Sequence, residues 1–131
     1  MLTDQQGYYV THLFLDKLWI SRKQEYDDDL PAMLGSMSLL SDGMPVDQAH
    51  WSHWKDYAPE QTLTADDAFY CMIAFLDAYR KLGEGDTHDI SRVIAWIDSA
   101  PDEMKDSWMQ CVQEVIHPDF DAVERLGLRF V

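Results

Sequence analysis

The sequence has few basic residues and few cysteines, and both shortages narrow the possible functions. Lysine and arginine number 10 against 24 aspartates and glutamates, which gives a formal net charge of −14. A charge of this sign and size repels nucleic acid and anionic membrane, so neither is expected as a partner. The two cysteines, Cys71 and Cys111, lie within apolar helical patterns. Each is predicted to be a small buried apolar residue.

Long apolar runs are also missing. None approaches the ~18 residues that a membrane-spanning helix needs. The opening MLTDQQGYY has no basic region followed by an apolar stretch, so a signal peptide is not expected. The chain has 131 residues, of which 47% are hydrophobic, and this predicts a single folded domain over residues 1–131. The expected location is the cytoplasm.

Catalytic and cofactor motifs are the third absence. The sequence contains no nucleophile elbow, phosphate loop or dinucleotide fingerprint, so no enzyme, cofactor or small-molecule substrate is expected. Asp47, His50 and His53 follow an i, i+3, i+6 spacing. That spacing turns away from one helix face, so no metal site is predicted. His12 is either a core histidine or a tuned acid or base, and an enzyme that uses His12 or buried carboxylates stays as an alternative.

Helical signals recur along the chain, whereas strand signals are scarce. Thr3 and Gln6 form a capping box before the first helix, and Asp47 can cap a later one. Pro101 suits the first turn of another helix, and Asp89 can cap the helix that precedes it. The sequence therefore predicts an all-α fold of about six helices.

One helix is predicted from its apolar spacing in LPAMLGSMSLL. Its stripe repeats at i, i+3, i+4, i+7 and i+10, from Leu30 to Leu40. Gly35 weakens this helix, and a close helix–helix approach would explain its presence. The segment SDGMPVD that follows has the composition of a turn.

Two segments of the sequence resemble each other. LTDQQGYYVTHLFLDKL (2–18) is followed 61 residues later by LTADDAFYCMIAFLDAY (63–79). The repeat predicts two three-helix units, at about 2–60 and 63–117, packed into one domain; the alternative is a chance similarity of short common motifs. The tail, 118–131, is predicted to be a short helix or turn, with a single short strand as a further option.

Acidic and aromatic residues near the middle of the chain form the candidate binding surface. Three consecutive aspartates exceed what a helix cap needs, and two tryptophans one turn apart follow an Asp-Gly turn. Acidic groups beside tryptophan suit a basic protein partner. The residues predicted to bind a partner are Asp27, Asp28, Asp29, Asp42, Asp47, Trp51 and Trp54.

The segment from Phe14 to Trp54 resembles small bacterial immunity proteins of contact-dependent growth inhibition and related polymorphic toxin systems. The similarity lies in an opening Leu-Thr, a Phe-Leu helix, Asp-Asp, the stretch GSMSLLSDG, Asp-x-Ala and Trp-x-x-Trp. The matching positions are Asp28-Asp29, Met33–Leu40, Asp42-Gly43, Asp47–Ala49, Trp51 and Trp54. The similarity covers about the first 57 residues well, and the rest only through the internal repeat.

The resemblance implies a protein without catalytic activity. Such an immunity protein binds one cognate toxin domain, often a basic nuclease, and occludes its active or nucleic-acid-binding site in the cytoplasm of the producing cell. The alternative from another class is an acidic adaptor or chaperone-like module that binds several basic proteins.

Overall fold

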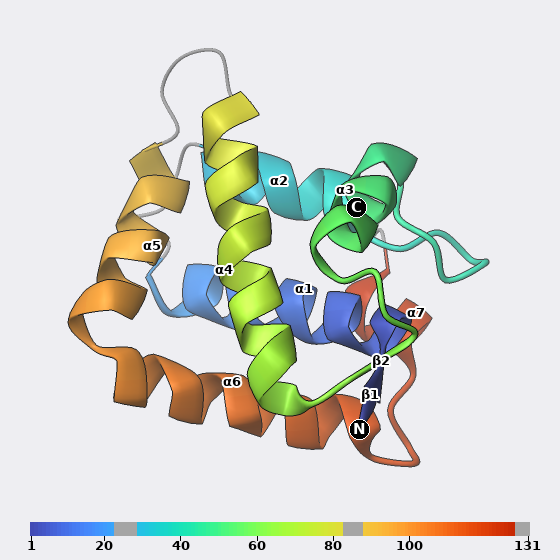
Figure 1. Cartoon of the computed structure of the whole chain (residues 1–131). Helices are drawn as coiled ribbons and strands as arrows, with labels where there is room; N and C mark the ends of the chain where they lie inside the picture. The colour runs from blue at the N-terminus through green and yellow to red at the C-terminus, as the bar shows by residue number, and fades with distance from the viewer. Residues whose placement is uncertain (23–28, 83–87, 128–131) are drawn as a thin grey trace.

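The chain folds into helices, as the sequence predicts, with one short pair of strands. The computed structural model describes residues 1–22, 29–82 and 88–127 (Figure 1). The elements in these ranges are β1 (Leu2–Thr3), α1 (Asp4–Ser21), α2 (Asp29–Met37), α3 (Gln48–Tyr57), β2 (Thr62–Leu63), α4 (Ala65–Leu82), α5 (His88–Ser99), α6 (Pro101–Ile116) and α7 (Ala122–Leu126). The all-α prediction is confirmed, and α7 adds a short helix in the predicted tail. None of the helices described is long and apolar enough to cross a membrane.

Most helix starts follow the predicted caps. The N–H of Gln6 donates to Thr3 Oγ1 at 3.0 Å, and the N–H of Thr3 donates to Gln6 Oε1 at 2.9 Å, which completes the capping box of α1. Asp47 caps α3 by accepting from the N–H of Ala49 at 3.0 Å. Local sequence therefore fixes where these helices begin.

The helix α2 ends earlier than its apolar stripe predicts. It stops at Met37, and Leu40, the last residue of the stripe, is 41% exposed. The backbone of Leu39 instead bridges to Pro45 and to Gly127, and its side chain takes the buried place. Gly35 also differs from expectation, since a Cβ there would meet no heavy atom within 4 Å. No neighbouring helix requires that glycine.

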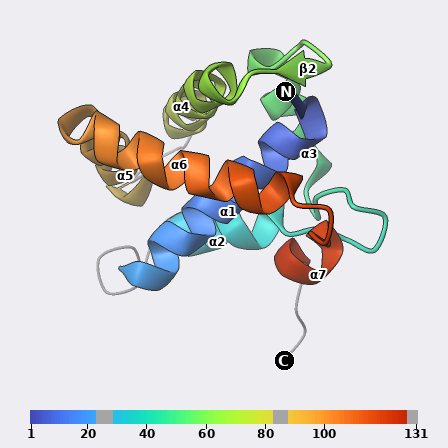
Figure 2. The ribbon, with the colours of Figure 1, turned by 90° about the horizontal axis from the view of Figure 1, so that it is seen from below.

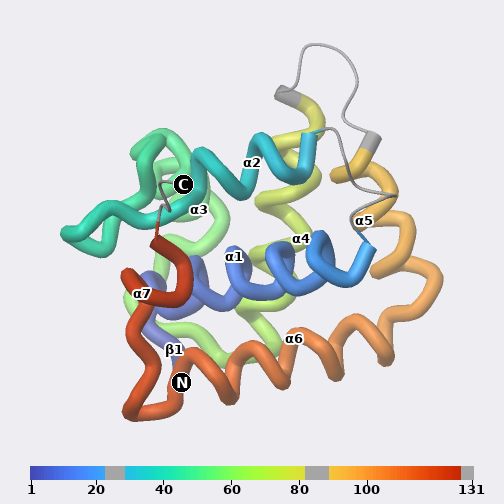
Figure 3. The backbone as a smooth tube through the Cα atoms, turned by 180° about the vertical axis from the view of Figure 1, so that it is seen from behind, coloured from blue at the N-terminus to red at the C-terminus, as the bar shows by residue number. Residues whose placement is uncertain are grey.

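The helix α1 lies at the centre of the domain. Figure 3 shows α1 between α2 and α6. Figure 1, seen from the other side, shows α4 crossing in front of α1. Seen from below, α6 crosses over α1, against which it packs (Figure 2). Its buried residues, which include Tyr8, Val10, Leu13 and Leu15, accordingly lie on several faces of the helix.

The two segments that the repeat relates, called the first and second halves below, make equivalent contacts. Leu2 of β1 pairs with Leu63 of β2 in an antiparallel ladder, and these residues are equivalent in the repeat. The helices α1 and α4 both have 18 residues. The first helix of each half packs against the third helix of the other, α1 on α6 and α4 on α3.

Two buried tryptophans occupy equivalent places in this arrangement. The indole N–H of Trp54 donates to the carbonyl of Asp4 at 3.0 Å, and that of Trp108 donates to Ala65 at the same distance. These carbonyls belong to the first residues of α1 and α4. Each indole meets one aromatic ring from either half, edge-on: Trp54 meets Tyr8 and Phe75, and Trp108 meets Phe69 and Phe14. The core is therefore shared between the halves.

The starts of α2 and α5 cap each other. Asp29 accepts from the N–H groups of Asp89 at 2.8 Å and Ile90 at 3.2 Å, and Asp89 accepts from the N–H of Leu30 at 3.0 Å. Asp89 was expected to cap its own helix, but it caps the equivalent helix of the other half. Each carboxylate also lies near the positive end of the helix that it caps.

Replacement of Asp29 by alanine leaves two N–H groups of α5 without their acceptor. The free energy of unfolding should fall by about 1–2 kcal/mol. Urea denaturation measures this change, with Asp98→Ala, an exposed position near the end of α5, as the control. A loss of less than about 0.5 kcal/mol for Asp29→Ala would contradict the capping role.

Two helical glycines should respond to alanine with opposite signs. A Cβ on Gly7 would lie 2.9 Å from Cζ2 of Trp54, so Gly7→Ala should destabilise the fold by about 1–3 kcal/mol. Gly35→Ala is the matched control, because it gains helix propensity in open space and should stabilise by about 0.5–1 kcal/mol. Thermal or urea unfolding measures the change in the free energy of unfolding of each variant. Equal changes in the two variants would contradict the contact between position 7 and Trp54.

Candidate partner-binding surface

The connection between α2 and α3 forms a hydrogen-bonded turn, Ser38–Asp47. The N–H of Leu40 makes no helical hydrogen bond and donates to the carbonyl of Met44 at 2.8 Å. The N–H of Gly43 donates to the carbonyl of Leu40 at 2.9 Å. Gly43 has a φ of 82°, which a side chain would strain. Figure 1 shows the turn projecting beyond the helices beside α3. The hydrogen bonds within the turn thus fix the conformation of its backbone.

Contacts from two other elements hold this turn. The hydroxyl of Tyr9 on α1 donates to the carbonyl of Gly43 at 2.9 Å. The N–H of Leu39 donates to the carbonyl of Leu126 at the end of α7, also at 2.9 Å. The turn is therefore anchored to the domain at its tip and at its base.

Two of the predicted partner-binding residues, Asp42 and Asp47, lie on this turn. Both are exposed, and each also accepts one backbone N–H, from Met44 and Ala49 at 2.9 and 3.0 Å. Leu40 and Val46 lie on the same turn and are 41% and 42% exposed. These two apolar residues were missed as binding candidates, because Leu40 continues a helical stripe in the sequence. We call Leu40, Asp42, Val46, Asp47 and Trp51 the turn face.

The predicted tryptophan pair separates into one core residue and one surface residue. Trp54 is 0% exposed, so its ring has no surface to offer a partner, and it is removed from the candidate surface. Trp51 is half-buried and packs edge-on against Tyr8 with ring centroids 5.9 Å apart. Helix geometry gives the reason. Residues three apart differ by about 60° around the helix axis, and this offset turns the second indole toward α1 and α4.

The predicted aspartate run contributes little to this surface. Asp27 and Asp28 lie outside the described residues. The carboxylate of Asp29 is part-buried and occupied by the N–H groups of α5. Asp29 therefore has a structural role in the domain.

Acidic side chains exceed basic ones on the surface as a whole. Within the described ranges, Lys17, Lys55, Arg80, Lys81, Lys105 and Arg125 each form an ion pair with an acid of this chain. The exposed acids are Asp42, Asp47, Asp56, Glu60, Asp66, Asp67, Asp98, Asp102, Glu103, Asp106, Asp119, Asp121 and Glu124. Most of the surface potential is consequently negative.

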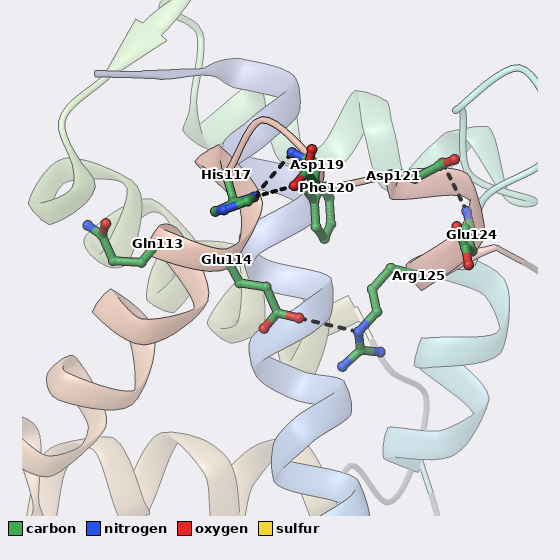
Figure 4. A pocket seen from close by; sticks show the side chains of 8 residues that line it. All are labelled: Gln113, Glu114, His117, Asp119, Phe120, Asp121, Glu124 and Arg125. Carbon is green, nitrogen blue, oxygen red and sulfur yellow. Dashed lines mark hydrogen bonds and ion pairs between the residues drawn. The ribbon is translucent and has the colours of Figure 1, made fainter.

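A pocket of about 590 Å³ lies between the end of α6 and α7 (Figure 4). Glu114 in its wall binds Lys17 at 2.6 Å and Arg125 at 3.5 Å, and the hydrogen bond from Lys17 holds the pKa of Glu114 below its usual range. Figure 4 also shows His117 beside Asp119. Glu114 thus joins α1, α6 and α7 through ion pairs, so the wall of the pocket contains a structural ion-pair network.

His12 lies in the wall of a second cavity of about 500 Å³, near Asp16 and Arg125. It is 4% exposed, hydrogen-bonds the backbone of Leu34, and its Nδ1 has no hydrogen-bond partner among the described residues. Burial lowers the pKa of His12 to about 4, and the positive charge of Arg125 acts in the same direction. The lining hydroxyl, Ser38, donates to the carbonyl of Leu34 at 2.9 Å. The cavity thus presents a neutral imidazole without an oriented nucleophile.

The three residues with metal-ligand spacing make separate contacts in the structure. Asp47 caps α3, His50 lies 2.7 Å from Ser36 Oγ, and His53 packs against the ring of Phe75. Among the described residues no group of three or more such side chains could hold a metal ion. Cys111 is buried, and burial raises the pKa of its thiol to about 11, while Cys71 is half-buried.

Comparison with known proteins adds no relative. No family model, curated protein or solved structure matches the chain. The fold and surface define an acidic all-α protein.

The low pKa of His12 predicts a pH dependence of stability. Between about pH 6.5 and 4 the unfolded chain binds a proton that the folded protein excludes, so stability falls as the pH decreases through this range. The loss attributable to His12 should approach roughly 3 kcal/mol at pH 4. His12→Ile, with the residue found at the equivalent position 73, should flatten the profile of unfolding free energy against pH. His117→Asn, at an exposed site, is the control; equal slopes in all three proteins would contradict the assignment.

Proposed function

We propose that this protein is an immunity protein that binds a cognate toxin domain, a basic nuclease, in the cytoplasm of the cell that makes both. The observation that carries the proposal is the acid surplus on the surface. The basic side chains in described ion pairs are already neutralised within the chain, so the exposed carboxylates outside these pairs remain available for a basic partner. A nuclease that binds phosphates offers a surface of the required sign.

The turn face is suited to the first contact. Leu40 and Val46 can be desolvated at the centre of an interface, while Asp42 and Asp47 lie at its edge and pair with lysine or arginine. Because their backbone is hydrogen-bonded and anchored to Tyr9, little ordering entropy is lost on binding. The carboxylates would occupy positions that phosphates take on the nuclease, which prevents nucleic acid from binding.

The surface charge also serves the rate of capture. A single free nuclease damages the cell, so fast association matters as much as slow release. Opposite net charges raise association rates by about 10–10³ at low ionic strength. An adaptor for many basic proteins would instead show micromolar, salt-sensitive binding to each of them.

The test is co-expression with the toxin domain encoded next to this protein, with cell growth and purified-domain affinity as readouts. The wild-type protein should restore growth and bind that one domain in the nanomolar range or tighter. Failure to protect against any adjacent toxin domain, or similar micromolar affinity for unrelated basic proteins, would reject the proposal.

Two pairs of charge changes localise the surface. Asp42→Asn with Asp47→Asn keeps the acceptors of the turn and of α3, and it should lower the affinity for the toxin domain about tenfold or more and reduce its salt dependence. Asp98→Asn with Glu103→Gln removes the same charge from α5 and α6, where both residues are exposed, and should alter the affinity less than threefold. Equal effects would mean that only net charge matters.

A further inference from the structure

Tyr9 and Tyr70 occupy the same position in the two halves of the fold. They are 61 residues apart, the spacing that also separates the starts of α1 and α4. Each packs edge-on against the preceding aromatic residue, Tyr9 on Tyr8 with ring centroids 6.5 Å apart and Tyr70 on Phe69 at 5.7 Å. What covers one ring can therefore be compared directly with what covers the other.

In the first half, the turn Ser38–Asp47 covers the tyrosine. The hydroxyl of Tyr9 donates to the carbonyl of Gly43, and a Cβ on Gly43 would lie only 3.2 Å from that hydroxyl. Tyr9 is half-buried, and this burial raises the pKa of its hydroxyl. The α1 surface around Tyr9 is thus a receptor for a polypeptide turn.

In the second half, the corresponding turn is missing. Ala100 alone separates α5 from α6, whereas the whole of Ser38–Asp47 separates α2 from α3. Tyr70 is accordingly 61% exposed. The position that the turn covers on α1 is therefore exposed to solvent on α4.

Charged groups surround this exposed ring. Lys105 Nζ lies 5.7 Å from the ring centroid of Tyr70 and 3.1 Å from Asp66 Oδ1. The hydrogen bond to Asp66 raises the pKa of Lys105, and the nearby carboxylate of Asp102 acts in the same direction. Asp67 is exposed on the same turn of α4. We call Asp66, Asp67, Tyr70, Asp102 and Lys105 the Tyr70 face. Three carboxylates against one ammonium make this face acidic.

We propose that the Tyr70 face binds a surface turn of a basic protein, in the position that Ser38–Asp47 takes in the first half. A backbone carbonyl of the bound turn accepts from the Tyr70 hydroxyl, as Gly43 accepts from Tyr9. Lysine or arginine beside that turn pairs with Asp66, Asp67 and Asp102. An exposed tyrosine within such a ring of charges has the composition of a binding hot spot.

Lys105 refines what the bound turn must contain. In the repeat it corresponds to Trp51, because Trp108 corresponds to Trp54 and each precedes its partner by three residues. Its ammonium can donate to a second carbonyl of the turn while Asp66 holds it in place. The face therefore selects backbone carbonyls at the centre and positive side chains at the edge. The identification of the basic protein as the toxin domain rests on the proposed function. The binding of a basic turn to the Tyr70 face does not.

A synthetic turn tests the face without the toxin. The probe is a cyclised peptide copied from residues 38–47 with lysine in place of both aspartates, titrated into isotope-labelled protein and followed by amide chemical shifts. Shifts should centre on Tyr70 and Lys105. Tyr70→Ala should weaken binding at least tenfold, and Tyr70→Phe, which loses only the hydroxyl donor, about threefold to tenfold. Tyr57→Ala, at another exposed tyrosine, is the matched control and should bind as wild type.

The outcomes separate the two proposals. Absence of peptide binding, shifts centred elsewhere, or equal binding by Tyr70→Ala would overturn the assignment of the face. Shifts at Tyr70 that appear on concentrating the protein alone would mean that a second copy takes the face, which also overturns it. Where the adjacent toxin domain binds, Tyr70→Ala should lower its affinity at least tenfold, and unchanged affinity rejects the face as a toxin contact. If the peptide binds and the toxin domain does not, the proposed function is rejected and the assignment of the Tyr70 face as a binding surface is retained.

Discussion

The fold depends on the two indole rings of Trp54 and Trp108. Each closes a hydrogen bond to the first carbonyl of a long helix and is enclosed by one aromatic ring from each half. Because both rings cross between the halves, neither half of about 60 residues contains a complete core, and a unit of that size is marginal by itself. The reciprocal caps of Asp29 and Asp89 impose the same dependence at the other end of the domain. The halves are therefore expected to unfold together.

A shared core leaves the connections free to differ. The two halves keep equivalent helices and equivalent tryptophans, yet one joins its second and third helices through Ser38–Asp47 and the other through Ala100. Loops carry recognition more often than the elements they connect, because they change without disturbing the packing. The difference also alters the helix surface beneath, since the extra turn covers Tyr9 and its absence exposes Tyr70. The difference between the two connections thus gives two unlike surfaces on equivalent helices.

Local patterns predicted the helices well because caps and apolar spacing act over a few residues. The capping box at Thr3 and the proline at the start of α6 are examples. Features that join distant residues were not predicted: Asp89 caps a helix 59 residues away, and Trp54 is buried although its helix has a polar sequence. The end of α2 was also missed, since the bridges of Leu39 to Pro45 and Gly127 compete with continuation of the helix. The sequence placed the candidate residues Asp42 and Asp47 on a turn, as the structure has them, while the exposure of Leu40, Val46 and Tyr70 required the structure.

The acidic residues divide into those that the fold uses and those that it does not. Asp29, Asp89 and Asp47 cap helices, and Asp77 pairs with two basic residues of its own helix. The exposed acids of α5 and α6 add like charges that repel one another and weaken the folded state. Solubility of a small domain needs a net charge of only about 2–8, well below the −14 found here. The charge exceeds what solubility needs and opposes folding. This surplus supports the proposed encounter with a basic partner, because long-range attraction is the property that it improves.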